Sequence, residues 1–251
     1  MVITTTAVAF SLSALGLAFV GLWFFKAFQK IGGLRSGSRI GILLSVHFLI
    51  LAFQHLLLGL GGLFFIVNSE ALYALLVVDN LVLAIVTSLG VYLLFYTLVP
   101  KYSPWFATIS ILIYGIFVTI VIFVTHPQPF MDAGKGINWN MPQLTKTLLY
   151  YLLLFNIGAP FLIFTKNFFT SGSRDVKTVS FIIMLATFLG LINISMGFTN
   201  FLNVSEDLRV HIFSRLLGTI GILFVIGFLI IPVARGWLSK KKGINEIENL
   251  A

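Results

Sequence analysis

Residues 71–99 decide the fold: they read ALYALLVVDNLVLAIVTSLGVYLLFYTLV, and their only charged side chain is Asp79. A helix that crosses a bilayer needs ~20 consecutive, mostly apolar residues. This run is longer than that requirement and contains no proline or charged break near its middle other than Asp79. It therefore predicts a membrane-spanning α-helix.

Six more runs of the same kind lie on either side of this one. In chain order, the seven runs are residues 5–25, 40–67, 71–99, 104–125, 147–165, 178–201 and 210–234. The breaks between them contain the glycine, proline and polar residues that end helices, and only the break at 126–146 is long. We expect an all-α fold, a polytopic bundle of seven transmembrane helices in one domain, 1–239, followed by a short tail, 240–251.

The composition supports a membrane protein. Of the 251 residues, 59% are hydrophobic and 10% are charged, whereas soluble domains contain about 45–50% apolar and about 25% charged residues. A soluble fold of this size could not bury so much apolar surface, but a lipid bilayer solvates it. Cysteine is absent, which excludes disulfides, thiolate metal sites and cysteine nucleophiles.

The positive charges predict the orientation. The formal net charge is +8, but the basic residues lie in short breaks between apolar runs, so we do not expect nucleic acid as a partner. The breaks 26–39, 100–103 and 166–177 and the tail 235–251 hold twelve Lys and Arg residues, and the opposite side holds three. The positive-inside rule then places the N-terminus outside and the C-terminus in the cytoplasm of a multi-pass protein of the cell membrane.

Polar residues inside the apolar runs are the candidate site. Ionisable side chains at bilayer depth are costly and are by default functional candidates. At ~1.5 Å per residue, most of the candidates fall in one layer of the outer half of the bundle, which a pocket open to the outside would produce. The predicted ligand-binding or buried polar cluster consists of Gln54, His55, Asp79, Asn80, Asn156, Asn193, Asn200, His211 and Arg215.

Two interpretations of this cluster stay open. Asp79 and Arg215 are opposite charges at similar predicted depths, and they could form a buried ion pair that holds two helices together. Asparagine and serine residues in membrane helices can also act only as interhelical contacts, worth ~0.6–2 kcal/mol each. Alternatively, the same residues bind a ligand or a proton. Gly59, Gly61 and Gly62 indicate close helix packing.

Several kinds of chemistry are excluded by the residues present. Covalent retinal needs a lysine in the last apolar run, 210–234, which has none. An intramembrane aspartyl protease needs two acids, and only Asp79 lies inside a run. We expect no catalytic residues, no metal ligands and no cofactor. Haem b stays open as an alternative because His55 and His211 could be axial ligands, although their predicted depths differ by ~12 Å.

The layout of seven helices, an external N-terminus and very short loops resembles the microbial rhodopsins. It is also similar to the seven-helix sensor regions in front of bacterial and archaeal histidine kinases. The sequence departs from the rhodopsins at the Schiff-base lysine, and it has no catalytic domain after Lys242. The resemblance implies an architecture and not a function.

Three functions are compatible with these residues. The first is a receptor-like or accessory membrane subunit, which binds a small ligand or a membrane partner through the outer half and contacts another membrane or cytoplasmic protein through the 26–39 and 166–177 loops. The second is a membrane subunit of an electron-transfer complex, with or without haem b. The third is a transporter that moves a small solute or a proton past Asp79.

Overall fold

A computed structural model of the chain describes residues 5–29, 36–64, 68–132, 136–172 and 174–203. Each of the first six predicted runs overlaps one helix of this part of the chain, although the bounds differ. The seventh run, 210–234, lies outside the described residues. The described elements are α1 (Thr5–Gln29), α2 (Ser36–Phe64), α3 (Ser69–Leu98), α4 (Pro104–Thr125), β1 (Phe130–Asp132), β2 (Gly136–Asn138), α5 (Gln143–Thr170) and α6 (Arg174–Asn203).

Within the described residues, four helices are long and apolar enough to cross a membrane. These are α2 from Arg39 to Phe64, and the whole of α3, α4 and α5. The apolar parts of α1 and α6 within the described residues are shorter, Phe10–Lys26 and Val176–Ile192. The length of α3, 30 residues, corresponds to ~45 Å of helix, more than the ~30 Å hydrocarbon core.

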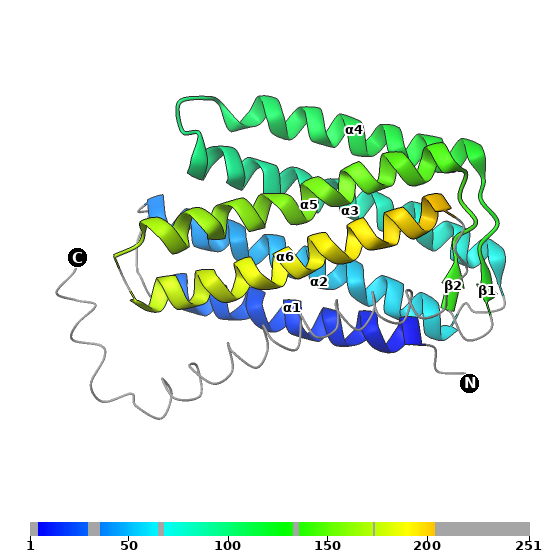
Figure 1. Cartoon of the computed structure of the whole chain (residues 1–251), viewed down its shortest axis with the longest axis horizontal. Coiled ribbons are helices and arrows are strands. Elements are labelled where there is room, and N and C mark those ends of the chain that lie inside the picture. The colour runs from blue at the N-terminus through cyan, green and yellow to red at the C-terminus, as the bar shows by residue number, and fades with distance from the viewer. Residues whose placement is uncertain (1–4, 30–35, 65–67, 133–135, 173, 204–251) are drawn as a thin grey trace.

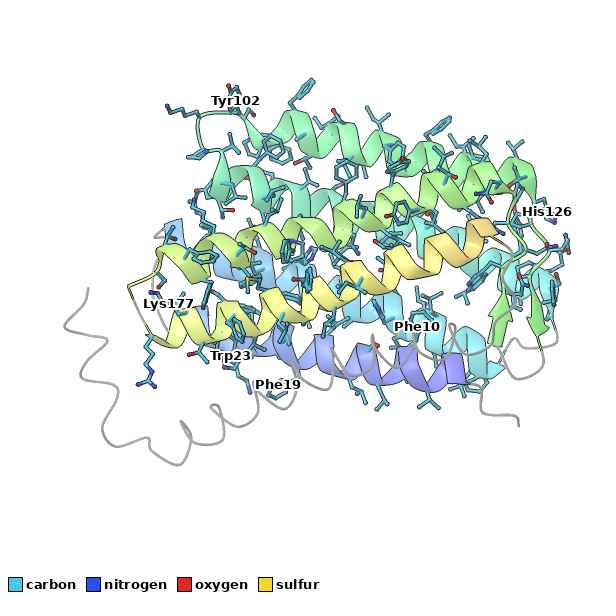
Figure 2. All side chains as sticks on the ribbon, viewed as in Figure 1. Phe10, Phe19, Trp23, Tyr102, His126 and Lys177 are labelled. Atoms are coloured by element: carbon cyan, nitrogen blue, oxygen red, sulfur yellow. The ribbon has the colours of Figure 1, made fainter. Side chains whose placement is uncertain are left out.

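Successive helices run antiparallel along the long axis of the bundle (Figure 1). The strands β1 and β2 form an antiparallel hairpin at one end, with Phe130 opposite Asn138; we call this the hairpin end and the other the loop end. His126 lies at the hairpin end, and Tyr102 and Lys177 lie at the loop end (Figure 2).

Helix α3 is the central helix because it packs against α2, α4 and α5, whereas α1 packs mainly on α2 and α6 on α5. Three clusters of buried side chains hold these helices together. The largest lies toward the loop end and joins α1, α2, α3, α5 and α6 through Val20, Phe24, Leu44, Phe48, Leu93, Ile163, Phe164 and Ile183. A second cluster at the hairpin end packs Met141 against Tyr73, Leu76, Val118 and Ile122.

Glycines allow several helices to approach closely. A Cβ atom added at Gly61 would lie 2.0 Å from Cδ2 of Leu75, and one at Gly59 would lie 2.7 Å from Oγ of Ser11. The predicted packing role is therefore confirmed for Gly59 and Gly61, which face α1 and α3 respectively. A Cβ at Gly115 would lie 2.3 Å from Cβ of Ala84, so α3 and α4 are also in close contact.

The structure differs from the prediction between residues 126 and 170. The run 147–165 ends at polar residues, but α5 extends from Gln143 to Thr170, because polar residues such as lysine and threonine continue a helix that is no longer apolar. Pro142 immediately precedes the helix, where its missing N–H costs no helical hydrogen bond. The β-hairpin was not predicted, since strands of three residues are too short for a periodic pattern.

Candidate functional site

The centre of the candidate site is a buried amide–carboxyl pair between α2 and α3. Nε2 of Gln54 donates to Oδ2 of Asp79 at 3.4 Å, and the two side chains are only 4% and 8% exposed. Each residue lies ten positions from the hairpin end of its helix, about 15 Å along the axis. Antiparallel packing brings the two residues to the same level, so the sequence places an acid and an amide together in the hairpin half of the bundle.

This pair has unused hydrogen-bonding capacity. Oε1 of Gln54 and Oδ1 of Asp79 are buried and have no hydrogen-bond partner among the described residues. Such atoms are uncommon, because most buried polar atoms are bonded to protein or to ordered water. An ionised carboxylate in apolar surroundings is costly unless it is paired. The pair can therefore accept hydrogen bonds from a further polar group.

Asn80, the next residue on α3, faces a different helix. Its Nδ2 donates to Oγ1 of Thr119 at 2.6 Å and to the carbonyl of Gly115 at 3.3 Å. Thr119 also donates to the carbonyl of Gly115 at 2.9 Å. These bonds lie at the position where Gly115 and Ala84 bring α3 and α4 together. Asn80 thus acts as an interhelical contact in this packing.

His55 also points away from Asp79. Its Nδ1 is 2.9 Å from the carbonyl of Leu51 in the same helix, and its ring centroid is 5.5 Å from that of Phe10 on α1. His55 therefore lies between α1 and α2, while Gln54 lies between α2 and α3.

A second polar level lies nearer the loop end. Nδ1 of His47, which is 1% exposed, is 3.1 Å from the carbonyl of Val86. Its Nε2 has no hydrogen-bond partner within the described segments. A Cβ at Gly90 would lie 3.0 Å from the His47 ring and 3.7 Å from Cβ of Ala159. Helices α2, α3 and α5 therefore meet around this histidine.

Asn156 on α5 lies one turn from Ala159 and belongs to the same interface. It is 4% exposed, and none of the residues that the structure describes forms a hydrogen bond with its Oδ1. Pro160 lies four residues later inside the helix, and because proline has no N–H, the Asn156 carbonyl lacks its usual helical donor. Pro160 was not among the predicted residues, although a proline inside the apolar run 147–165 indicates an interrupted helical hydrogen bond.

An apolar layer separates the two polar levels. Leu83 and Val86 lie on α3 between Asp79 and Gly90, spaced so that all four share one face of the helix. Leu83 and Val86 pack with Leu152 of α5 in one buried cluster, and these three side chains are at most 1% exposed. The polar atoms consequently do not form a continuous row through the bundle.

The remaining predicted residues are placed less completely. Asn193 and Asn200 lie on α6, and their side chains are outside the described part, as are His211 and Arg215 altogether. The predicted Asp79–Arg215 contact and the His55–His211 haem ligation therefore stay predictions. Within the described residues, no three His, Asp or Glu side chains lie close enough together to hold a metal ion.

Comparison of the chain with protein-family models, with curated proteins and with solved structures gives no match. The chemistry of the site therefore rests on its own geometry. The Gln54–Asp79 pair offers two oxygen acceptors and a carboxyl group in an apolar surrounding. This arrangement suits binding of a small hydrogen-bond donor, and the described residues around it contain no nucleophile–base pair for catalysis.

Proposed function

We propose that this chain is a receptor-like or accessory subunit of the cell membrane that binds a small ligand or a membrane partner through the Gln54–Asp79 pair. The proposed bundle has seven transmembrane helices, its N-terminus outside and its C-terminus in the cytoplasm. This layout resembles the microbial rhodopsins. The ligand would reach the pair from the hairpin end, which this orientation makes the outer end.

One observation carries the proposal. Gln54 and Asp79 are buried in the hairpin half of the bundle and hydrogen-bonded to each other, and each retains an oxygen that no described residue contacts by a hydrogen bond. A pair that served only to join α2 and α3 would be expected to use these acceptors within the protein. The open acceptors indicate that a group beyond the described residues completes the site, and we propose that this group belongs to a ligand or a membrane partner.

A transporter is the second candidate, because polar atoms that lack a partner in the described part of the chain occur at both levels of the interface, at Asp79 and at His47. The layer of Leu83, Val86 and Leu152 interrupts any path between them in this conformation. Binding without permeation therefore fits the geometry better. An electron-transfer subunit with haem b at His55 and His211 is the third candidate, and a Soret band in the absorption spectrum of the purified protein would identify it.

The reactivity of an introduced cysteine tests the proposed pocket. Because the sequence contains no cysteine, the introduced thiol is the only one that can react. Gln54→Cys in proteoliposomes is treated with a charged, membrane-impermeant methanethiosulfonate. Leu83→Cys is the matched control, because Leu83 lies one turn deeper than Asp79 on α3 and is 1% exposed. We expect Gln54→Cys to react at least about tenfold faster, since a water-filled pocket admits the reagent. Equal, slow reaction at both positions would show that the pair is only a packing contact.

Binding is tested by thermal unfolding against a panel of small amines and polyols, which donate hydrogen bonds to carboxyl and amide oxygens. A ligand present at a hundred times its Kd adds about 2.7 kcal/mol to the free energy of unfolding. We expect such a shift in the wild type and its loss in Asp79→Leu. Equal shifts in both proteins would place the ligand elsewhere.

A further inference from the structure

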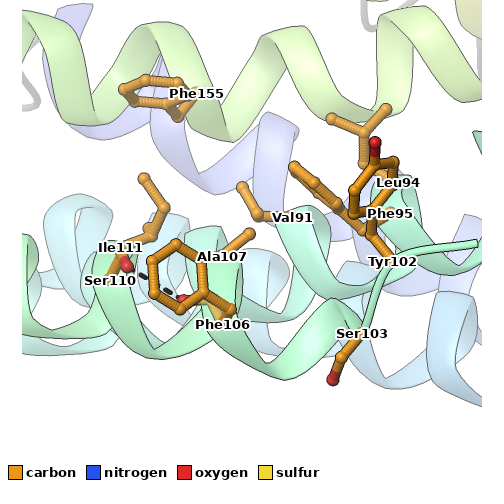
Figure 3. Close-up of a pocket in the computed structure, with 10 residues that line it drawn as sticks. All are labelled: Val91, Leu94, Phe95, Tyr102, Ser103, Phe106, Ala107, Ser110, Ile111 and Phe155. Atoms are coloured by element: carbon orange, nitrogen blue, oxygen red, sulfur yellow. Dashed lines mark hydrogen bonds between the residues drawn. The ribbon is translucent and has the colours of Figure 1, made fainter. Parts of the chain in front are cut away.

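A groove lies between α3, α4 and α5 and is lined by residues of all three helices (Figure 3). Its lining residues lie nearer the loop end than the Gln54–Asp79 pair does. Helices α4 and α5 approach each other near the hairpin and diverge toward the loop end (Figure 1), and α3 forms the floor between them. The groove has a volume of about 530 Å³. Its walls include Val91, Leu94 and Phe95 of α3, Ala107 and Ile111 of α4, and Phe155 of α5.

The interior of the groove is apolar even at Ser110, a polar residue that lines it. The hydroxyl of Ser110 faces the groove but donates to the Phe106 carbonyl at 2.9 Å (Figure 3). The described residues that line this groove include no charged side chain. Its walls therefore match a hydrocarbon chain rather than a polar ligand.

A second recess of about 540 Å³, more polar than the groove, adjoins it at the α3–α4 loop, and Tyr102 and Ser103 line both cavities. The recess is also lined by Lys101 and Ile40. Lys101 is exposed, as is Arg39, the residue before Ile40 in the sequence. An apolar groove thus continues into a recess that carries positive charge.

The aromatic residues around this recess fit the boundary between hydrocarbon and headgroups. The ring of Tyr92 packs against Trp105 with centroids 5.2 Å apart and stacks on Tyr96 at 6.1 Å. Tyrosine and tryptophan are enriched at membrane interfaces. From Ser103 to Ile111 the groove extends about 12 Å along α4, close to the ~15 Å hydrocarbon depth of one leaflet.

We propose that the groove and the recess together bind one membrane phospholipid with a net negative headgroup. One acyl chain lies in the groove between α4 and α5, and the headgroup lies against Lys101 in the recess. This lipid site is separate from the ligand site proposed above and does not depend on it.

The dimensions favour a lipid chain over a helix of a partner or of a second copy. A transmembrane helix needs contact along much of the ~30 Å hydrocarbon core, whereas the groove extends only about 12 Å along α4. A flexible chain fits without movement of α4 or α5. Lys101 in the adjoining recess would favour an anionic headgroup, whereas an apolar groove alone would not distinguish between headgroups.

Native mass spectrometry of the full chain in detergent tests the proposal, with dioleoylphosphatidylglycerol as the anionic probe and dioleoylphosphatidylcholine as the zwitterionic one. We expect about fivefold tighter retention of phosphatidylglycerol, the preference that one basic residue near the headgroup provides. Lys101→Gln should abolish this preference and leave phosphatidylcholine retention unchanged. Ala107→Phe, which fills the groove, should reduce retention of both lipids severalfold.

Two matched variants control for general effects. Lys177→Gln removes an exposed cation at the same end on α6, and Ala74→Phe enlarges an exposed alanine of α3 near the hairpin; neither should change lipid retention. Thermal unfolding verifies that all four variants fold. Equal retention of the two lipids by the wild type, or the same loss in Lys177→Gln as in Lys101→Gln, would overturn the headgroup site. A dimer that Ala107→Phe dissociates would overturn the lipid in favour of a second copy.

Discussion

Gly115→Ala is expected to destabilise the bundle by separating α3 from α4. The new Cβ would lie 2.3 Å from Cβ of Ala84 and 3.0 Å from its Cα, whereas carbon atoms in contact are about 3.5–4.0 Å apart. The helices would have to move apart by roughly 1.2–1.7 Å. That shift also lengthens the Asn80–Thr119 hydrogen bond, now 2.6 Å.

Overpacking of this kind costs about 1–3 kcal/mol, which corresponds to a decrease of about 2–12 °C in Tm for a chain of this size. Thermal unfolding in detergent measures it. Gly158→Ala is the matched control, because a Cβ there has no neighbour within 4 Å and alanine favours the helix. Ala84→Gly should partly restore the stability of Gly115→Ala. Equal Tm values for the Gly115 and Gly158 variants would refute the close contact.

Three further outcomes are expected. A cysteine at Asn140 should react with an impermeant thiol reagent on intact cells and one at Ser171 should not; the reverse pattern would invert the proposed orientation. Retinal followed by borohydride should leave no covalent chromophore, and a stable adduct would show an unforeseen reactive lysine. If Asp79 and Arg215 form an ion pair, Asp79→Asn and Arg215→Gln should each cost about 3–5 kcal/mol and the double variant much less; additive losses would exclude the pair.

The helices could be predicted because an apolar run of bilayer length satisfies its backbone hydrogen bonds in lipid by forming a helix. The run 71–99 became α3, with Ser69 and Leu98 as its limits. Its N-terminal cap was less visible: Asn68, which looked like part of a loop, accepts a hydrogen bond from the Ala71 N–H at 3.0 Å. Helix ends depend on such local bonds and on polar residues that hydropathy does not detect.

The level of the polar residues along the bundle could be predicted, but the neighbouring helix that each side chain faces could not. Counting residues along antiparallel helices brings Gln54 and Asp79 to one level, yet the same count also grouped them with Asn80 and His55. The structure turns Asn80 toward Thr119 and His55 toward Phe10. Which neighbour a polar residue faces depends on helix rotation, and that is set by contacts from several helices together.

The distribution of contacts also has a consequence for the order of assembly. The most extensive interfaces join helices that follow one another, α1 with α2, α3 with α4, and α5 with α6. The Asn80–Thr119 bond lies within one such unit, whereas the Gln54–Asp79 bond joins two of them. Contacts between neighbours in sequence form with the smallest loss of chain entropy. We therefore expect the α3–α4 unit to fold early during synthesis, and Asp79 to acquire its amide partner only when that unit docks on α2.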